Sequence, residues 1–245
     1  MNKLIQNHKI PCYQTDSSWR LKPAAFMDLA QEAANAHAVI LGFGYDDLIQ
    51  SRTAWILSRV NIRFIKTPLW RDEVTLTTWH KGLERLFFIR DFIMTDKDGN
   101  ECVKATSSWL VLNLDTRRLV RDPNLMDEGT TCSDNALETS AGKVQMPKDV
   151  EPELVMTHKV AYSDVDMNAH ANNAMYMHWA MNAVGYAVTE NRAVKSWTIN
   201  FNNEIKPQED VDLYRVCTEA EDGLHVFIDG KVADKTAFIV EIVFA

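Results

Sequence analysis

The sequence predicts an α+β chain made of two similar halves, each with a curved antiparallel sheet around one long helix. The order of a loop, a long helix and several strand-like runs occurs twice along the 245 residues. The segment NIRFIKTPLWRDEV (61–74) also resembles TINFNNEIKPQEDV (198–211), which indicates an internal repeat. Two such copies in one chain would form a pseudo-dimer.

The first half begins with a predicted helix over residues 23–41. Pro23 suits the first helical position, Gly42 suits the stop, and small and apolar residues recur on one face between them. Strand-like runs follow, and the Asp98-Gly99 pair predicts the turn between the last two of them. These runs cover residues 53–66, 73–80, 85–95 and 101–114.

A polar stretch punctuated by Pro and Gly, residues 122–149, is typical of a linker. We therefore expect an N-terminal domain over residues 1–125, a linker over 126–150 and a C-terminal domain over 151–245. The second half opens with a helix over 172–188 that is apolar nearly all round, so we expect it to be buried on all sides. Its strand-like runs cover residues 196–205, 211–219, 224–229 and 236–244.

The composition is that of an ordinary globular protein, with 46% hydrophobic and 24% charged residues. A formal net charge of -8 argues against a nucleic-acid binder, because neutralising phosphates needs a basic surface. The four cysteines form no CxxC pair, so we expect neither a zinc ribbon nor a redox motif. No apolar run is long enough to cross a membrane and the start of the chain resembles no targeting peptide, so we expect a cytoplasmic protein.

The segment SDVDMNAHANNAMYMHW (163–179) concentrates polar side chains directly before the second helix. Asn172 or Asn173 suits the helix N-cap, because a short polar side chain accepts hydrogen bonds from the first free backbone N–H groups. The polar positions are Asp164, Asp166, Asn168, His170, Asn172 and Asn173.

Within this segment, Asp166, Asn168 and His170 stand at alternate positions and would project together from an extended backbone. A carboxylate, an amide and an imidazole together can orient a water molecule and stabilise an oxyanion near the positive end of a helix. The structural alternative is a loop cluster that forms Asx-turns.

The pattern D-x-D-x-N-x-H-x-N-N-x-x-Y in this segment closely resembles the active-site signature of the acyl-acyl carrier protein thioesterases. In the first half, WRDEVTLTTW (70–79), IRDFIMTDKDGNECVKATSSWLVLNLDTRRLVRDP (89–123) and the SRVNIRF strand resemble the same family. The resemblance covers nearly the whole chain, apart from the linker and the extreme termini. It implies a tandem hotdog fold and hydrolysis of fatty acyl thioesters on acyl carrier protein.

The resemblance also implies the site residues. Asp166, Asn168 and His170 match the family's catalytic residues, and Glu204 falls at the position of its catalytic glutamate. The family often has a cysteine at the next position, but this chain has Ile205, so no thiolate nucleophile is available there. We expect a water molecule activated by Glu204 and Asp166, with either carboxylate as the base.

The position of Glu204 in its strand does not fit this role simply. Alternation along TINFNNEI puts Glu204 on the polar face with Asn200 and Asn202. We therefore expect either a bulge near Asn203 or a sheet edge that turns into the site. The corresponding loop of the first half has Asp16 but no Asn-x-His, so we expect one site per chain.

The family places the acyl chain in the first hotdog, so apolar residues of the first helix and its neighbouring strands are candidates for the pocket, with ordinary core packing as the alternative. These candidates are Phe26, Leu29, Ala33, Ile56 and Leu57. Acyl carrier protein is acidic, as this chain is, so docking requires a local basic patch, with a solvated loop as the alternative. The patch candidates are Arg85, Arg90, Arg117, Arg118 and Arg121. We expect no metal, no cofactor and no membrane partner, and either a monomer or a homodimer.

Other functions are compatible with parts of this pattern. An acyl-CoA thioesterase of the same fold would use nearly identical chemistry. A non-catalytic acyl-binding protein would not need the full set of polar residues. A metal-dependent hydrolase would use His158, His170 and His178, whose spacing matches no compact ligand pattern.

Overall fold

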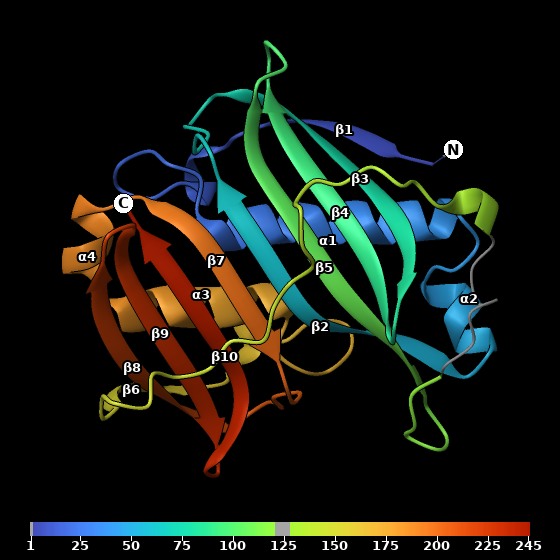
Figure 1. The fold of residues 1–245 in the computed structure, drawn as a ribbon. Coiled ribbons are helices and arrows are strands. Elements are labelled where there is room, and N and C mark those ends of the chain that lie inside the picture. Colours follow the sequence, from blue (N-terminus) through green and yellow to red (C-terminus); the bar gives the residue numbers. More distant parts are fainter. Residues whose placement is uncertain (1, 121–127) are drawn as a thin grey trace. The chain divides into compact units, whose positions relative to one another are not determined.

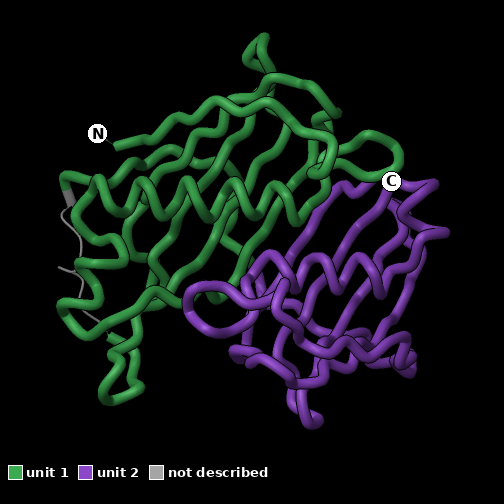
Figure 2. Tube along the Cα trace, turned by 180° about the vertical axis from the view of Figure 1, so that it is seen from behind, with its two compact units in different colours: residues 1–141 green, residues 142–245 purple. Residues whose placement is uncertain are grey.

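The chain forms two compact units, residues 1–141 (unit 1) and 142–245 (unit 2) (Figure 2). The computed structural model describes residues 2–120 and 128–245. The boundary between the units falls inside the stretch expected to be the linker, 126–150. Each unit has a long helix against an antiparallel sheet (Figure 1), as the predicted α+β class requires.

Unit 1 arranges its strands in the order β1-β3-β4-β5-β2, and each neighbouring pair is antiparallel. The predicted helix and strands are confirmed, whereas the sequence patterns do not predict β1 and α2. The elements are β1 (Leu4–Lys9), α1 (Pro23–Ile40), α2 (Tyr45–Gln50), β2 (Thr53–Phe64), β3 (Glu73–Glu84), β4 (Phe87–Asp96) and β5 (Glu101–Asn113).

The helix α1 begins and ends where local chemistry requires. Pro23 occupies its first turn, where a missing backbone N–H breaks no hydrogen bond, and Gly42 follows its end with φ +80°. The buried face combines Phe26 with small residues such as Ala30 and Ala33, which are 3% and 1% exposed. These small side chains let the helix lie close to the sheet.

Unit 2 arranges its strands in the order β7-β10-β9-β8-β6, again with antiparallel neighbours. The predicted strands are confirmed, and β6 is an additional strand that the patterns do not predict. The elements are β6 (Glu153–Lys159), α3 (Asn173–Val184), α4 (Tyr186–Asn191), β7 (Val194–Phe201), β8 (Asp210–Ala220), β9 (Gly223–Val232) and β10 (Lys235–Phe244).

The helix predicted over residues 172–188 is two helices. Gly185 has φ +93° and ends α3, and α4 begins at the next residue. Trp179 and Met177 of α3 are 1% and 0% exposed, but Asn182 is exposed, so the prediction of burial on all sides is wrong at that position. The buried side chains make α3 the centre of the unit 2 core.

The internal repeat is confirmed in the backbone. Phe64 and Phe201, which the two matched segments align, are the last residues of β2 and β7. Arg71 and Gln208, which are also aligned, have left-handed φ values of 74° and 70°. The two units therefore build the same strand end and the same loop from different side chains.

Two hydrogen bonds hold the middle of the expected linker, one within each unit. The Ala136 N–H donates to Asp91 Oδ2 of β4 at 2.8 Å, inside unit 1. The Val144 N–H donates to Asn200 Oδ1 of β7 at 2.7 Å, inside unit 2. Residues around these contacts therefore belong to the packed units, although their polar composition resembles that of a free linker.

Replacing Gly230 with alanine should destabilise unit 2 by about 1–3 kcal/mol. Gly230 of β9 is paired with Phe238 of β10, and a Cβ at Gly230 would lie 2.0 Å from the Phe238 ring. Phe238 is 0% exposed and packs against Tyr176 of α3, so its ring has no free space into which to move. Urea unfolding followed by tryptophan fluorescence measures the loss.

Gly142→Ala is the matched control in the same unit, because a Cβ at Gly142 would meet nothing within 4 Å. Its free energy of unfolding should stay within about 0.5 kcal/mol of the wild-type value. Equal losses in the two variants would contradict the steric explanation.

Candidate active site

The residues from Asp166 to His170 form a tight turn. The Asp166 N–H donates to the His170 carbonyl at 3.1 Å, and the Asn168 N–H donates to Asp166 Oδ1 at 2.8 Å. Ala169 adopts φ +61° to close the turn. The backbone is therefore not extended, so the condition under which alternate side chains would project together is not met, and the Asx-turn alternative describes the backbone.

The turn leads directly into α3 through Asn172. Its Oδ1 accepts a hydrogen bond from the Ala174 N–H at 2.9 Å, which confirms the predicted N-cap. Its Nδ2 donates to Asp166 Oδ2 at 3.2 Å. One side chain therefore caps the helix and fixes the second oxygen of the Asp166 carboxylate.

A buried carboxylate anchors this segment to the core. Asp164 is 2% exposed, accepts from the Ala161 N–H at 2.8 Å, and lies 2.9 Å from His158 Nε2. Burial disfavours its charge, but the hydrogen bonds from Ala161, His158 and Trp179 outweigh burial and hold the pKa of Asp164 below its ordinary value. The role of Asp164 is to position the turn.

Glu204 lies in a loop rather than in a strand. β7 ends at Phe201, and the next two N–H groups, of Asn202 and Asn203, both donate to the Ala237 carbonyl, at 2.8 and 3.0 Å. The chain turns at this point, so strand alternation does not decide where Glu204 points. Two successive N–H groups bonded to one carbonyl of the partner strand are the pattern of a bulge at Asn202 and Asn203, the first of the two expected alternatives.

A backbone hydrogen bond brings this loop beside the turn of residues 166–170. The Ala171 N–H donates to the Ile205 carbonyl at 2.8 Å. Glu204 and Asn168 are exposed, Asp166 and His170 are half-buried, and Ile205 is 0% exposed. The structure thus brings together the segments that carry all of the predicted catalytic residues.

Tyr176 of α3 interacts electrostatically with Asp166 and Glu204. It is the last residue of the signature pattern, but the sequence alone assigns it no role. Its side chain is buried, with 3% exposed. Burial chiefly raises the pKa of Tyr176, and the negative charges of Glu204 and Asp166 raise it further. Both carboxylates therefore act on the same phenol, which stays neutral.

Unit 1 contains the same turn without the same chemistry. The Asp16 N–H donates to the Arg20 carbonyl at 2.9 Å, the Ser18 N–H donates to Asp16 Oδ1 at 2.9 Å, and Trp19 has φ +67°. Arg20 also forms an ion pair with Asp16 at 2.9 Å. The aspartate is therefore a turn-forming residue in both units, and the amide and imidazole distinguish unit 2.

The unit 2 site suits the activation of water. Two carboxylates can hold a water molecule and accept its proton, and an amide and an imidazole can donate hydrogen bonds to the reacting oxygen. The start of α3 contributes positive potential. The N–H groups of Ala174 and Met175 already bond to Asn172 at 2.9 Å each, so an oxyanion needs another donor.

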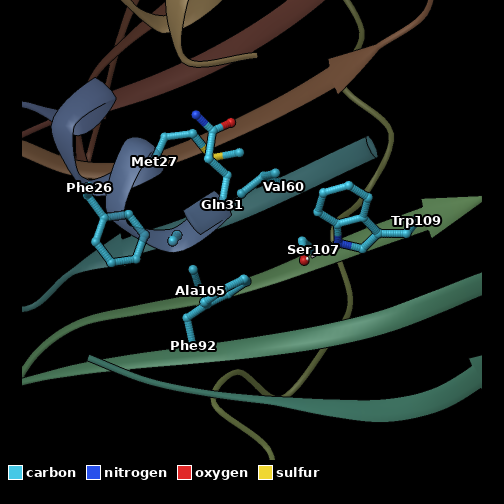
Figure 3. Close-up of a pocket in the computed structure, with 9 residues that line it drawn as sticks. Phe26, Met27, Gln31, Val60, Phe92, Ala105, Ser107 and Trp109 are labelled. Carbon is cyan, nitrogen blue, oxygen red and sulfur yellow. Dashed lines mark hydrogen bonds between the residues drawn. The ribbon is translucent and has the colours of Figure 1, made fainter. Parts of the chain in front are cut away.

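A small cavity in unit 1 lies between α1 and the sheet (Figure 3). Its volume of about 10 Å³ holds at most one water molecule. Of the candidate acyl-pocket residues, Phe26 lines this cavity, whereas Leu29, Ala33, Ile56 and Leu57 do not. Its other lining residues include Met27, Gln31, Val60, Phe92, Ser107 and Trp109.

Only some of the arginines predicted to form the basic patch are exposed. Arg85, Arg117 and Arg118 are exposed, at turns that follow β3 and β5. Arg90 is 6% exposed and donates to His37 and Thr78, so its assignment to a surface patch is wrong. The Arg90 side chain reaches His37 of α1. Arg121 lies outside the described residues.

No cluster of His, Cys, Asp and Glu side chains in residues 2–120 and 128–245 is arranged to hold a metal ion. His158, one of the three histidines of the metal-hydrolase alternative, is held by Asp164. Within the same described residues, no helix has the length and apolar character that crossing a membrane requires.

Comparisons with known proteins agree with one another. Residues 1–128 match the family model of the acyl-ACP thioesterase N-terminal domain, and residues 148–240 match that of the C-terminal domain. The chain is 29% identical to oleoyl-acyl carrier protein thioesterase 2, chloroplastic, of Arabidopsis thaliana, over 76% of this chain and 55% of that protein. It is 26% identical to the palmitoyl-acyl carrier protein thioesterase, chloroplastic, of the same plant, over 81% of this chain and 51% of that protein. The chain thus spans about half the length of these relatives.

Solved structures share the fold. An acyl-ACP thioesterase from Bacteroides thetaiotaomicron superposes with a TM-score of 0.86 and 22% identity, over 99% of this chain and 98% of that chain. The 12:0-ACP thioesterase from Umbellularia californica superposes with a TM-score of 0.90 and 20% identity, over 99% and 97%.

Replacing Asp164 with asparagine should reduce the pH dependence of stability. The folded pKa of Asp164 lies below the ordinary value of 3.8, so its stabilising effect is present above about pH 4 and is lost as the pH falls through the lowered pKa. The wild-type free energy of unfolding should therefore fall more steeply below pH 4 than that of Asp164→Asn. At pH 7 the variant should be less stable by about 1–3 kcal/mol.

Urea unfolding between pH 2.5 and 7 checks this, with Asp210→Asn as the control, because Asp210 is an exposed carboxylate of the same unit. Identical pH profiles for the wild type and Asp164→Asn would contradict the anchoring role.

Proposed function

Because the chain belongs to the acyl-acyl carrier protein thioesterase family, we propose that it hydrolyses the thioester of fatty acyl-acyl carrier protein. The products are a free fatty acid and the carrier protein thiol, and chain elongation ends. The observation that carries the proposal is the hydrogen bond from Ala171 to Ile205, which brings the turn of residues 166–170 beside Glu204.

The two carboxylates differ in their freedom to bind water. Asp166 Oδ1 accepts from the Asn168 N–H and Oδ2 accepts from Asn172. Glu204 forms no hydrogen bond or ion pair with any other described residue, so its oxygens are free to accept one from a water molecule. We assign the general base to Glu204 and the orientation of the water to Asp166.

Hydrolysis proceeds by direct attack of this water on the thioester carbonyl. Glu204 takes the proton as the O–C bond forms, and Asn168 and His170 donate hydrogen bonds to the reacting oxygen. The C–S bond then breaks, and the thiolate recovers a proton through Glu204 or His170. The residue after Glu204 is the buried Ile205, so water rather than a thiolate is the nucleophile.

We interpret the two units as two hotdogs in tandem, with the acyl chain bound in unit 1 beneath α1. The acyl chain would enter at the small cavity lined by Phe26 and Met27, and movement of the lining side chains would enlarge this cavity. Each methylene that enters gains about 0.8 kcal/mol. The depth of the opened cavity would therefore set the preferred chain length.

The acidic carrier protein would dock on the basic end of the unit 1 sheet. β4 and β5 are antiparallel, with Phe88 opposite Trp109, so the turn holding Arg85 and the turn holding Arg117 and Arg118 lie at the same end of the sheet. A local patch is needed because the whole chain carries a net charge of -8. An acyl-CoA thioesterase of this fold is the second candidate function, since its substrate presents the same thioester.

The purified protein should hydrolyse acyl carrier protein thioesters of eight to eighteen carbons faster than the matched acyl-CoA esters. The measurement is kcat/KM from release of free thiol or fatty acid. Faster turnover of the CoA esters would transfer the assignment to the second candidate. Hydrolysis of neither, by folded protein that still binds acyl chains, would leave a binding protein.

Asp166→Asn should lower kcat by about 10²–10³-fold while the fold is retained. The asparagine oxygen can still accept the Asn168 hydrogen bond of the turn, so the backbone is kept, whereas the charge and the hydrogen bond from Asn172 are removed. Asp16→Asn is the matched control, because Asp16 forms the same turn in unit 1. Equal activity of Asp166→Asn and the wild type would contradict the assigned role.

Glu204→Gln should lower kcat by at least about 10²-fold, because the amide cannot accept the proton from water. The exposed Glu190→Gln of the same unit should retain wild-type activity. A pH–rate profile separates the two carboxylates, since loss of the general base removes the acidic limb. A Glu204→Gln profile that keeps this limb would assign the base to Asp166.

A further inference from the structure

Tyr176 of α3 contacts both ends of the loop that carries Glu204. Its ring packs edge to face on Phe201, the last residue of β7, with 5.3 Å between the ring centroids. Its hydroxyl is hydrogen-bonded to the backbone of Ile205, the residue after Glu204. The Ile205 carbonyl accepts from the Ala171 N–H at 2.8 Å. One side chain, 3% exposed, therefore reaches the loop both before and after the proposed base.

The Ile205 N–H is the donor in the bond to the hydroxyl. Burial raises the pKa of Tyr176 above its ordinary value, so the hydroxyl keeps its proton at neutral pH, whereas the bond to the Ile205 backbone acts in the opposite direction. A hydrogen bond lowers the pKa of a phenol when it is donated to the oxygen, because it then stabilises the phenolate. Ile205 therefore uses both of its backbone polar groups, the carbonyl towards the start of α3 and the N–H towards Tyr176.

Unit 1 contains the same backbone contact between a turn and a loop. The Leu21 N–H, directly after the unit 1 turn, donates to the Pro68 carbonyl at 2.8 Å. The internal repeat aligns Pro68 with Ile205, in the same register that aligns the last residues of β2 and β7. The two units can therefore be compared residue by residue around this bond.

The aromatic contact is also repeated in unit 1. Phe26 is the fourth residue of α1, as Tyr176 is of α3. Phe26 packs edge to face on Phe64, the last residue of β2, with 6.3 Å between the ring centroids. The ring at this helix position is therefore a packing residue in both units, and unit 2 adds the hydroxyl.

The equivalent positions of unit 1 lack both halves of the hydrogen bond. Phe26 has no hydroxyl to accept it, and Pro68 has no backbone N–H to donate it. The residue aligned with Glu204 is Thr67, so the carboxylate is absent there as well. The donor, the acceptor and the proposed base thus occur together in unit 2. Packing does not explain the hydroxyl, because Phe26 makes the same ring contact without one.

We propose that Tyr176 is a positioning residue for Glu204, whose hydroxyl fixes the loop after β7 so that the carboxylate can take the proton from the attacking water. The inference rests on the proposed function, because it assigns a role within the same site. The loop is also fixed before Glu204, where the Asn202 and Asn203 N–H groups donate to the Ala237 carbonyl. Glu204 stands between these two fixed points, so loss of the second one allows its carboxylate to move.

Tyr176→Phe removes the hydroxyl and keeps the ring. It should lower kcat for an acyl carrier protein thioester by about 10–100-fold and leave KM within about twofold, because a small displacement of a reacting group slows the chemical step. Tyr214→Phe is the matched control, since Tyr214 of β8 is a half-buried tyrosine of the same unit, and it should keep the wild-type kcat. A wild-type kcat in Tyr176→Phe would overturn the proposal.

A double-mutant cycle with Glu204 separates positioning from general support of the fold. If Tyr176 acts through Glu204, Tyr176→Phe should change the residual kcat of Glu204→Gln by less than about twofold. Equal fold losses in the wild-type and Glu204→Gln backgrounds would show that Tyr176 acts independently of Glu204, which contradicts the proposal.

Amide hydrogen exchange of the full chain, followed by NMR, tests the contact without measuring activity. The Ile205 amide should exchange at least about tenfold faster in Tyr176→Phe than in the wild type. The Ala174 amide, which donates to Asn172 at the start of α3, should keep its rate. An unchanged Ile205 rate would show that the hydroxyl does not hold the loop.

Two further outcomes remain decisive. If Tyr176→Phe does not fold, the wild type decides, since a protected Ile205 amide supports the hydrogen bond and a freely exchanging one overturns it. If the wild type hydrolyses no carrier protein thioester, the proposed function fails, whereas the exchange rates still support or overturn the hold of Tyr176 on the loop.

Discussion

The hydrogen bond from the Ala171 N–H to the Ile205 carbonyl is the contact on which the site depends. It joins a turn that precedes a helix to a loop that follows a strand, two segments more than thirty residues apart. Because the bond uses backbone atoms, it fixes the positions of Asp166 and Glu204 without using either carboxylate. The carbonyl of the buried Asp164 accepts from the Asn172 N–H at the end of the turn, and the buried Tyr176 is hydrogen-bonded to the Ile205 backbone.

The fold could be predicted largely where its determinants are local. Pro23 and Asn172 set the starts of α1 and α3, and the alternation of apolar residues located the longer strands. The short strand β1 has a half-exposed, mostly polar sequence that resembles a loop, and pairing with β3 is what makes it a strand. Gly185 breaks a helix whose apolar pattern continues past it, so periodicity alone could not place that break.

The sequence named the residues of the proposed site but could not predict their geometry. The spacing of Asp166, Asn168 and His170 is the same in a strand and in a turn, and hydrogen bonds to backbone atoms decide between them. Glu204 could not be oriented because the end of β7 is set by its pairing with β10. The exposure of Arg90 was predicted wrongly because an arginine in a strand usually lies at the surface, and the sequence does not show which helix covers the strand.

The duplicated turn separates the residues that build the backbone from those to which we assign a catalytic role. In both units the frame needs one aspartate, one left-handed residue and backbone hydrogen bonds. The side chains of Ser18, Asn168 and His170 make none of these bonds, whereas the Arg20 side chain pairs with Asp16. Side chains outside these bonds can be exchanged at little cost to folding. The turn of unit 1 could therefore acquire a different set of reactive side chains by substitution while its backbone stays the same.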